Sequence, residues 1–291
     1  MFEITMLGTS AAVPTPYRNL SSIAVRKDGD VFLLDCGEGT QRQMMKFGVS
    51  YMKIKAIFIS HTHLDHWLGM PGLIDTMNMN GRTELLMVYL PNGLAERLAE
   101  LEGRRPFVKF VELKEGVLAD FGEFSVSAFP TKHSPSSFGF VFEEKEKRRF
   151  YEDKAHAAGV KGQLFSKIMK EGELKIGGKK VLLKNITYLQ AGKKIVYTSD
   201  TSPCAAVAKA AKGADLLIHE ATFTDEHEAE AKEANHSTAA QAAQTAKKAG
   251  AKKLLLTHIS GRYRDTAPIL EEAKKHFANV SVAEDGMKVE I

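Results

Sequence analysis

The stretch SHTHLDHWLG, residues 60–69, follows the apolar run 56–59 and is dense in metal-binding side chains. These side chains are His61, His63, Asp65 and His66. Because they cannot all share one face of a strand or a helix, a turn must present them. A turn anchored at the end of a buried strand holds several side chains rigidly toward one point. Imidazole nitrogens and carboxylate oxygens are ligands that Zn²⁺ takes, so the stretch predicts a site for two adjacent ions.

Three more polar residues stand at the ends of apolar, strand-like runs. His133 follows SVSAFPTK, Asp200 follows KIVYTS, and His258 follows KLLLT. If these strand ends meet at one sheet edge, seven ligands are available for two zinc ions, with Asp200 suited to bridge them. Catalytic dinuclear sites hold their metals about 3.5–4 Å apart with a hydroxide between them. Mn²⁺ and Fe²⁺ are alternatives, because metal availability as well as ligand type decides occupancy.

Composition describes an ordinary globular protein. The chain has 291 residues, 44% hydrophobic and 26% charged, which predicts one large domain or two smaller ones. No apolar run approaches the roughly 18 residues that cross a bilayer. The N-terminal MFEITMLGTS has an acidic residue where a signal peptide has basic ones. Cys36 and Cys204 form no CxxC motif and are expected to be small buried side chains. We therefore expect a cytoplasmic protein with no membrane partner.

Strand-like and helix-like segments alternate along the chain, which predicts an α/β fold. Strands are expected at 2–9, 22–26, 31–37, 56–61, 85–91, 107–113, 124–133, 138–144, 194–200, 215–222 and 253–260. Helices are expected at 38–47, 71–79, 92–102, 204–212, 237–249 and 267–277. In the alanine-rich helix 237–249, Ser237 is the expected N-cap and Gly250 the expected end.

Positive charge is concentrated in one segment. The formal net charge is +4, and residues 143–184 contain twelve Lys and Arg against seven Asp and Glu. The rest of the chain therefore carries a net charge of −1. Segment 143–190 also interrupts two strand-like runs, which predicts an inserted basic arm within a single domain 1–291. A solvated surface excursion is the alternative interpretation of such a charge run.

Several motifs resemble those of the ribonuclease Z family of the metallo-β-lactamase superfamily. They are LGTSAAVPTPYRN (7–19), FLLDCGEGTQRQ (32–43), ISHTHLDHWLGMPGL (59–73), HEATF (219–223), HST (236–238) and LLLTHISGRY (254–263). The resemblance implies an αββα sandwich with a dinuclear zinc site at one edge of its paired sheets. It also implies an endoribonuclease that removes the 3′ trailer from precursor tRNA by metal-hydroxide phosphodiester hydrolysis and leaves a tRNA 3′-hydroxyl.

The resemblance also assigns roles to single residues. One zinc is implied at His61, His63 and His133, a second at Asp65, His66 and His258, and a bridge at Asp200. Asp65 is in addition the implied general base. Glu220 and His236 are the implied pair that protonates the leaving 3′-oxygen. A carboxylate beside His236 would keep its imidazolium form populated near neutral pH.

The family further implies a flexible arm, or exosite, that grips the tRNA, and a homodimer. Lysine and arginine contacts to phosphate supply affinity without reading sequence. The expected RNA contacts are Lys161, Lys167, Lys170 and Lys175 in the arm, with Arg18 in the early loop. That loop departs from the family, since Pro16 stands where lysine is frequent. The cut position relative to the discriminator base or an encoded CCA is therefore open.

Two other functions fit the ligand pattern. One is a hydrolase of the same fold that acts on cyclic nucleotides, lactones or sulfate esters. The other is a non-catalytic RNA-binding scaffold with a relic site. The basic arm and the HEAT and HST motifs argue against the first, and the intact set of ligands argues against the second.

Overall fold

The computed structural model of the chain describes residues 1–99 and 103–291. Its internal contacts define two compact units. Unit 1 consists of Met1–Phe142 together with Lys194–Ile291, and unit 2 is Glu143–Lys193. The expected insertion 143–190 therefore corresponds to a unit with contacts of its own.

Unit 1 is built on two seven-stranded sheets. The first has the order β20 (Lys288–Glu290), β1 (Phe2–Gly8), β3 (Ser22–Lys27), β4 (Asp30–Leu34), β5 (Ile54–Phe58), β6 (Leu86–Leu90) and β7 (Val108–Glu112). The second has the order β19 (Val280–Val282), β17 (Leu254–Thr257), β16 (Leu216–Glu220), β15 (Lys194–Tyr197), β10 (Phe138–Glu144), β9 (Phe124–Pro130) and β8 (Gly116–Asp120). Strands β4 to β7 run parallel to one another, as do β15, β16, β17 and β19.

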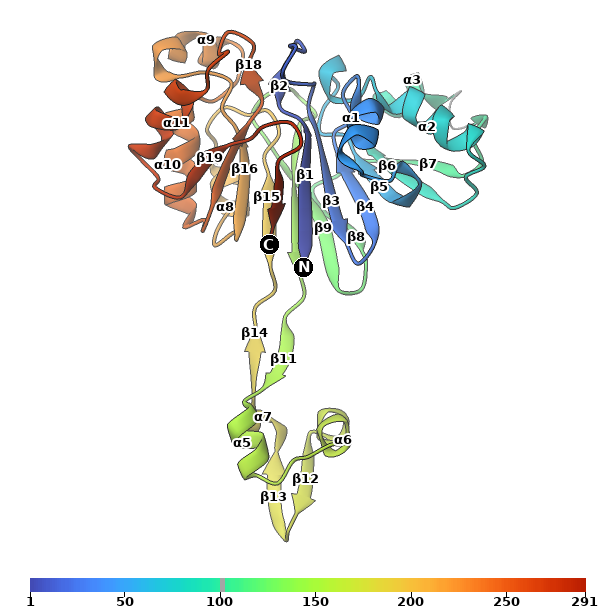
Figure 1. The fold of residues 1–291 in the computed structure, drawn as a ribbon, viewed down its shortest axis with the longest axis vertical. Helices are drawn as coiled ribbons and strands as arrows, with labels where there is room; N and C mark the ends of the chain where they lie inside the picture. The colour runs from blue at the N-terminus through green and yellow to red at the C-terminus, as the bar shows by residue number, and fades with distance from the viewer. Residues whose placement is uncertain (100–102) are drawn as a thin grey trace. The chain divides into compact units, whose positions relative to one another are not determined.

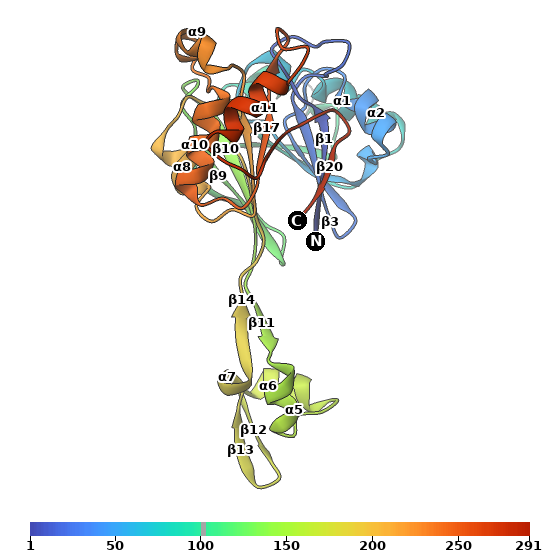
Figure 2. The same cartoon turned by 60° about the vertical axis from the view of Figure 1, so that its left-hand side comes forward.

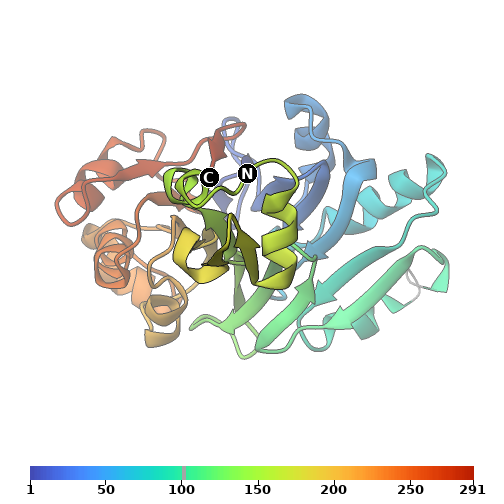
Figure 3. The same ribbon diagram turned by 90° about the horizontal axis from the view of Figure 1, so that it is seen from below.

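Helices cover the outer face of each sheet (Figures 1 and 3). The first sheet carries α1 (Thr40–Phe47), α2 (Met70–Met79) and α3 (Leu94–Arg97), and the second carries α8 (Ala205–Ala210), α10 (Ala239–Ala249) and α11 (Ala267–Lys274). Shorter elements are β2 (Ser10–Ala11), β18 (Ile259–Ser260), α9 (Glu228–Glu233) and the 3-10 turns Tyr51–Lys53, Leu64–His66 and Asp225–His227. A phenylalanine-rich core fills the space between the sheets, and two further cores lie beneath the helix layers. The predicted αββα sandwich is confirmed.

Unit 2 has a small apolar core of its own. Strand β11 (Lys147–Phe150) pairs with β14 (Thr187–Gln190), and β12 (Glu173–Ile176) pairs with β13 (Lys179–Leu182). Between them lie α5 (Glu152–Ala157), α6 (Leu164–Glu171) and α7 (Leu183–Ile186) (Figure 2). The buried side chains are Ala155, Val160, Ile168, Leu174, Val181 and Ile186. The basic segment is thus a folded module whose core residues are spaced among exposed lysines.

The expected elements of unit 1 agree with the structure to within a few residues, with some exceptions. Within the expected helix 92–102, the described residues contain α3 and a further helical residue, Ala99, and residues 100–102 lie outside the described part of the chain. Strands β8, β19 and β20 were not expected from the sequence. They are short or lie at the edges of the sheets, where the hydrophobic pattern is weakest.

The expected cap of helix α10 was wrong by one residue. Thr238 is the N-cap: its hydroxyl accepts the backbone N–H of Gln241, whose side chain accepts the N–H of Thr238 in return. Ser237 instead donates its hydroxyl to the carbonyl of Thr201 at 2.6 Å. Gly250 ends the helix with a φ of 65°, as expected.

The two cysteines are free thiols with different surroundings. Cys36 is buried as expected, whereas Cys204 is only half-buried, so the expectation was wrong there. Among the described residues, no helix combines the length and the apolar character needed to cross a membrane. The cytoplasmic location stays a prediction.

Candidate metal centre and active site

Every predicted ligand in unit 1 follows the carboxyl end of a strand. The group from His61 to His66 follows β5, and the other three, His133, Asp200 and His258, follow β9, β15 and β17. Non-glycine residues with positive φ turn the chain after three strands, namely Asp35 (58°) after β4, Ser199 (53°) after β15 and His258 (56°) after β17. Such strained backbone is typical of functional sites held by a rigid scaffold. The two sheets thus supply ligands to a common edge.

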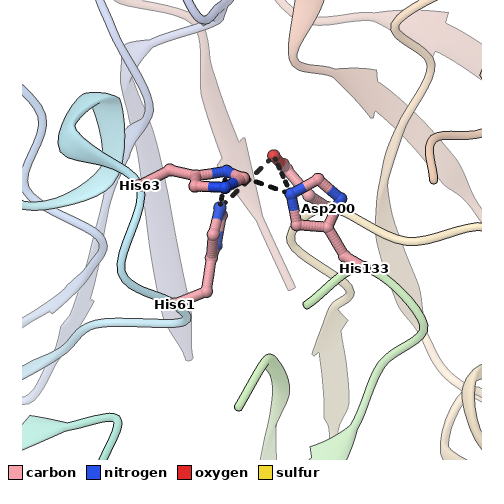
Figure 4. Close-up of side chains that lie close together, drawn as sticks. All are labelled: His61, His63, His133 and Asp200. Atoms are coloured by element: carbon pink, nitrogen blue, oxygen red, sulfur yellow. Dashed lines mark hydrogen bonds and ion pairs between the residues drawn. The ribbon is translucent and has the colours of Figure 1, made fainter. Parts of the chain in front are cut away.

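Three histidines and one aspartate form the first ligand group (Figure 4). Nε2 of His61 and Nε2 of His133 lie 3.0 Å and 3.1 Å from Nδ1 of His63. Oδ2 of Asp200 is 3.6 Å from Nε2 of His61 and 3.7 Å from Nε2 of His133. The four ligand atoms lie within 4.8 Å of one another, so a single ion could contact all of them.

The second ligand group consists of Asp65, His66 and His258. Oδ2 of Asp65 lies 3.4 Å from Nε2 of His66 and 3.5 Å from Nε2 of His258. Asp200 reaches this group as well, because its Oδ2 is 3.3 Å from Nε2 of His66 and its Oδ1 is 3.4 Å from Nε2 of His258. Asp200 therefore occupies the position of a ligand shared by the two groups.

Unsatisfied buried atoms show that these residues fit bound cations. Within the described residues, His66 Nε2, His258 Nε2 and Asp200 Oδ1 are buried and form no hydrogen bond. Leaving such atoms unpaired costs free energy, and most buried polar atoms avoid it. Each of the three belongs to a ligand group, where a cation would pair with it. The nitrogen and carboxylate donors suit zinc, manganese or iron.

The opposite ring nitrogens of four ligand histidines are held by outer partners. His66 Nδ1 lies 2.8 Å from Asp35, His61 Nδ1 3.0 Å from Ser60, His133 Nδ1 3.1 Å from the Asn235 carbonyl, and His258 Nδ1 3.0 Å from Thr222. Such partners fix the ring orientation and leave the other nitrogen free for the metal. Asp35 also accepts hydrogen bonds from the Ser60 N–H and the Tyr197 hydroxyl, both at 2.8 Å.

Sequence reasoning missed these outer partners. For Asp35 a signal existed, because it ends the apolar run VFLL just as Asp200 follows its own strand. Ser60 and Thr222 lie within the quoted motifs and Asn235 directly precedes one, but nothing local indicates that they contact a ligand histidine. Their roles depend on which strand ends the fold brings together.

The protonation of the ligands suits metal binding. Burial lowers the pKa of His61 and His133, which favours neutral imidazole. Burial raises the pKa of Asp65 and Asp200, but the neighbouring histidines, His66 among them, outweigh it and leave both pKa values below the usual range. Burial likewise lowers the pKa of His66, but Asp200, Asp35 and Asp65 raise it well above the usual range. The raised pKa of His66 reflects the negative charge of these carboxylates, which a metal ion would balance in place of the ring proton.

A carboxylate–imidazole pair lies beside the ligand groups. Oε1 of Glu220, a fully buried residue at the end of β16, is 2.8 Å from Nδ1 of His236. The same oxygen accepts the N–H of Thr201 at 2.9 Å. The His236 ring centroid lies 4.8 Å from that of His133 and 5.4 Å from that of His258, which belong to different ligand groups. His236 is therefore a neighbour of both ligand groups.

The pair keeps a proton available on His236. Burial lowers the pKa of His236, but the charge and hydrogen bond of Glu220 outweigh it and raise that pKa to about 9. Burial raises the pKa of Glu220, and the charge and hydrogen bond of His236 more than offset it, so that the Glu220 pKa is lowered. An ionised carboxylate beside an imidazolium is the arrangement a general acid needs.

The early loop and the arm lysines have different surroundings. Ala12, at a φ of 55°, donates its N–H to Oδ2 of Asp65 at 3.0 Å. Nη1 of Arg18 donates to Thr9 at 2.7 Å and to the Ala283 carbonyl at 2.6 Å, so this guanidinium holds the loop in place. The lysines expected to contact RNA are exposed residues of unit 2: Lys161, Lys167, Lys170 and Lys175. RNA contact by these residues and by Arg18 stays a prediction.

Two family models match the chain. The model described as anti-Pycsar protein Apyc1 matches residues 2–171, and the model of the β-lactamase superfamily domain matches residues 181–259. Curated relatives match at full length. The chain is 44% identical to ribonuclease Z of Methanosarcina acetivorans, covering 100% of this chain and 98% of the relative. It is 41% identical to ribonuclease Z of Archaeoglobus fulgidus, covering 100% and 98%.

Solved structures are also similar to the chain over its full length. The short form of human tRNase Z superposes with a TM-score of 0.72 at 30% identity, covering 99% of each chain. A metallo-β-lactamase fold protein from Bacillus subtilis superposes with a TM-score of 0.75 at 21% identity, covering 100% of this chain and 99% of the other, which supports the fold alone. The chain therefore belongs to the ribonuclease Z family and is an RNA-cleaving enzyme with the metallo-β-lactamase fold.

Proposed function

We propose that this protein is a zinc-dependent endoribonuclease that removes the 3′ trailer from precursor tRNA and leaves a tRNA 3′-hydroxyl. One observation carries the proposal. The Glu220–His236 pair lies beside two ligand groups joined by Asp200. This arrangement puts a proton donor next to the position where two cations would hold a phosphodiester.

The chemistry divides between the centre and its neighbours. The two ligand groups would each hold one divalent ion, and Asp200 would serve both. Such ions would activate a water molecule and neutralise charge on the phosphate. Asp65 is held as a carboxylate, with its Oδ2 accepting the Ala12 N–H at 3.0 Å. Its lowered pKa suits it to orient the attacking water as a hydrogen-bond acceptor. His236 then donates a proton to the departing 3′-oxygen, with Glu220 stabilising its charged form.

The charge and the cleft of unit 2 favour a large RNA substrate. It contains the segment that carries the positive excess of the chain. A cleft within the unit is lined by Arg148, Arg149, Phe150, Glu152, His156, Phe165 and Tyr188. Cationic and aromatic side chains together are typical of surfaces that bind RNA backbone and unstacked bases. A hydrolase of small esters would have no use for such a unit, which favours tRNA over the small-molecule alternative.

Two further proposals come from the family. We propose a homodimer, and we propose that unit 2 contacts the body of the tRNA away from the cleaved bond. The exposed lysines of unit 2 and their phosphate contacts would then set affinity, while the centre in unit 1 sets chemistry.

Incubation with a 3′-extended precursor tRNA, beside a cyclic nucleotide at equal concentration, tests the proposed function. We expect one cut at the junction of tRNA and trailer, with a much larger kcat/KM for the tRNA. A larger kcat/KM for the cyclic nucleotide would establish the small-molecule alternative. Binding of tRNA with no cleavage of either compound would establish the scaffold.

A further inference from the structure

Thr222 is the one outer partner of a ligand histidine, among those described above, that also contacts the Glu220–His236 pair. Its hydroxyl lies 3.0 Å from Nδ1 of His258 and 2.7 Å from Oε2 of Glu220. It is 3.3 Å from Nδ1 of His236, which has a closer partner in Glu220 at 2.8 Å. Thr222 is buried, at 4% exposure, so water does not compete for these contacts.

The direction of these hydrogen bonds follows from the number of protons. A threonine hydroxyl has one proton to donate and lone pairs that accept. The Glu220 carboxylate is an acceptor only, and it already takes N–H donors from Thr201 at 2.9 Å and Thr222 at 3.2 Å. The Thr222 proton therefore goes to Glu220, and its lone pair accepts the N–H at Nδ1 of His258.

This direction fixes the tautomer of His258. With its proton held at Nδ1, His258 presents the lone pair of Nε2 to the metal position. That Nε2 is among the buried atoms that form no hydrogen bond within the described residues. The negative charge of Glu220 acts on His258 through the hydroxyl, which increases the basicity of the ligand nitrogen.

The backbone holds Thr222 in place. Its carbonyl accepts the N–H of Ser260 at 3.3 Å, and the N–H of Ala221 is donated to the Thr257 carbonyl at 2.9 Å. The loop after β16 is thereby tied to both sides of His258. The backbone of Thr222 is positioned by the fold, independently of its side-chain partners.

We propose that Thr222 is a positioning residue that fixes the metal-binding tautomer of His258 and the rotamer of Glu220 through a single hydroxyl. It thus couples the second metal position to the proton donor. The proposal rests on the proposed function, since it requires the ligand groups to hold metal and the pair to supply a proton.

The test uses the metal-loaded full chain, titrated with a chromophoric chelator to measure how tightly each ion is held. In Thr222→Val, which keeps the shape and removes the hydroxyl, we expect the affinity of one ion to fall about 10–100-fold. The ion held by His61, His63 and His133 should be unaffected. Thr222→Ser should restore the wild-type affinity, because it restores the hydroxyl. With metal saturating, kcat for precursor tRNA should fall in Thr222→Val while KM stays constant.

Thr245→Val is the matched control. Thr245 is also a buried threonine, and its hydroxyl donates to the Gln241 carbonyl within helix α10 at 2.9 Å. The Thr245→Val variant should be less stable, with no change in the affinity of either ion. If Thr222→Val unfolds, Thr222→Ala removes the same hydroxyl without adding volume.

Three results would overturn the inference. The first is that Thr222→Val holds each ion as tightly as wild type does. The second is that metal affinity decreases as much in Thr222→Ser as in Thr222→Val. The third is that metal affinity decreases by a similar factor in Thr245→Val. A wild-type chain that holds no metal would instead refute the proposed function, so the two failures are distinguishable.

Discussion

Replacing Glu220 with glutamine removes the negative charge beside His236 at nearly constant volume. The glutamine oxygen can keep the Thr222 hydrogen bond, and its NH₂ group then faces the donors at Thr201 N and His236 Nδ1. Two donors facing each other disfavour a proton on Nδ1. The substitution therefore leaves the metal ligands in place and makes the imidazolium form of His236 less stable.

The magnitude follows from the pKa of His236, which Glu220 raises from 6.5 to about 9 against the opposing effect of burial. That difference corresponds to about 3 kcal/mol. A raised histidine pKa means that the imidazolium persists until the pH rises through that value and is lost above it. Without the carboxylate, the pKa should fall to 6.5 or lower. At about pH 8 the imidazolium fraction then drops roughly 30-fold, and the rate with it.

The assay compares two substrates over a range of pH. For precursor tRNA, the basic limb of the kcat profile should move to lower pH in Glu220→Gln, because the leaving 3′-oxygen requires a proton. For bis(p-nitrophenyl) phosphate the decrease in rate should be small, since nitrophenolate leaves without one. Bound cations would lower the pKa of His236 in both proteins, so both profiles shift while their separation remains. With metal saturating, the metal content of Glu220→Gln should match that of wild type.

Two outcomes would refute this reasoning. One is a basic limb at the same pH in variant and wild type. The other is an equal decrease in rate on both substrates, which would show that Glu220 acts on the centre as a whole and not on the leaving group.

Further predictions concern the metal, the acid, unit 2 and assembly. His63→Ala or Asp200→Ala should lose metal and activity together, and elemental analysis that finds no transition metal in active protein would contradict this. His236→Ala should keep its metal and slow tRNA cleavage by roughly 10²–10⁴, so a normal rate would exclude it as the acid. Replacing residues 151–186 with a Gly/Ser linker keeps the β11–β14 pair and removes the core of unit 2. KM for tRNA should rise, and the small phosphodiester should react as before. The log–log salt slope of tRNA binding should flatten by about one unit for every lysine–phosphate pair that the replacement removes. Unchanged tRNA kinetics would make unit 2 a surface excursion. Light scattering should give a dimer mass at micromolar concentration, and a fully active monomer would exclude the dimer.

The fold and the seven candidate ligands were predictable because the signal is local, whereas the division of the ligands into two groups came from the family resemblance. Asp200 and His258 end apolar runs, and parallel strands place such ends at one edge. The N-cap of α10 was also within reach, since Thr238 and Gln241 have the capping-box spacing whereas Ser237 is followed three residues later by Ala240.

The outer partners and unit 2 were harder to predict for physical reasons. Thr222 contacts His258 across two strands, and that contact depends on the register of β16 with β17. In unit 2, short elements place single apolar residues such as Ile168 and Val181 among lysines, so no run is long enough to reveal the core. Local patterns indicate which residues are buried, and only the assembled fold shows which polar atoms meet.

Cleavage of precursor tRNA in water labelled with oxygen-18 tests the central claim most directly. If a metal-activated water attacks and His236 protonates the leaving 3′-oxygen, the label must appear in the 5′-phosphate of the released trailer. The tRNA must then end in an unlabelled 3′-hydroxyl. A 2′,3′-cyclic phosphate on the tRNA, or label in a phosphate left at its 3′ end, would contradict the account.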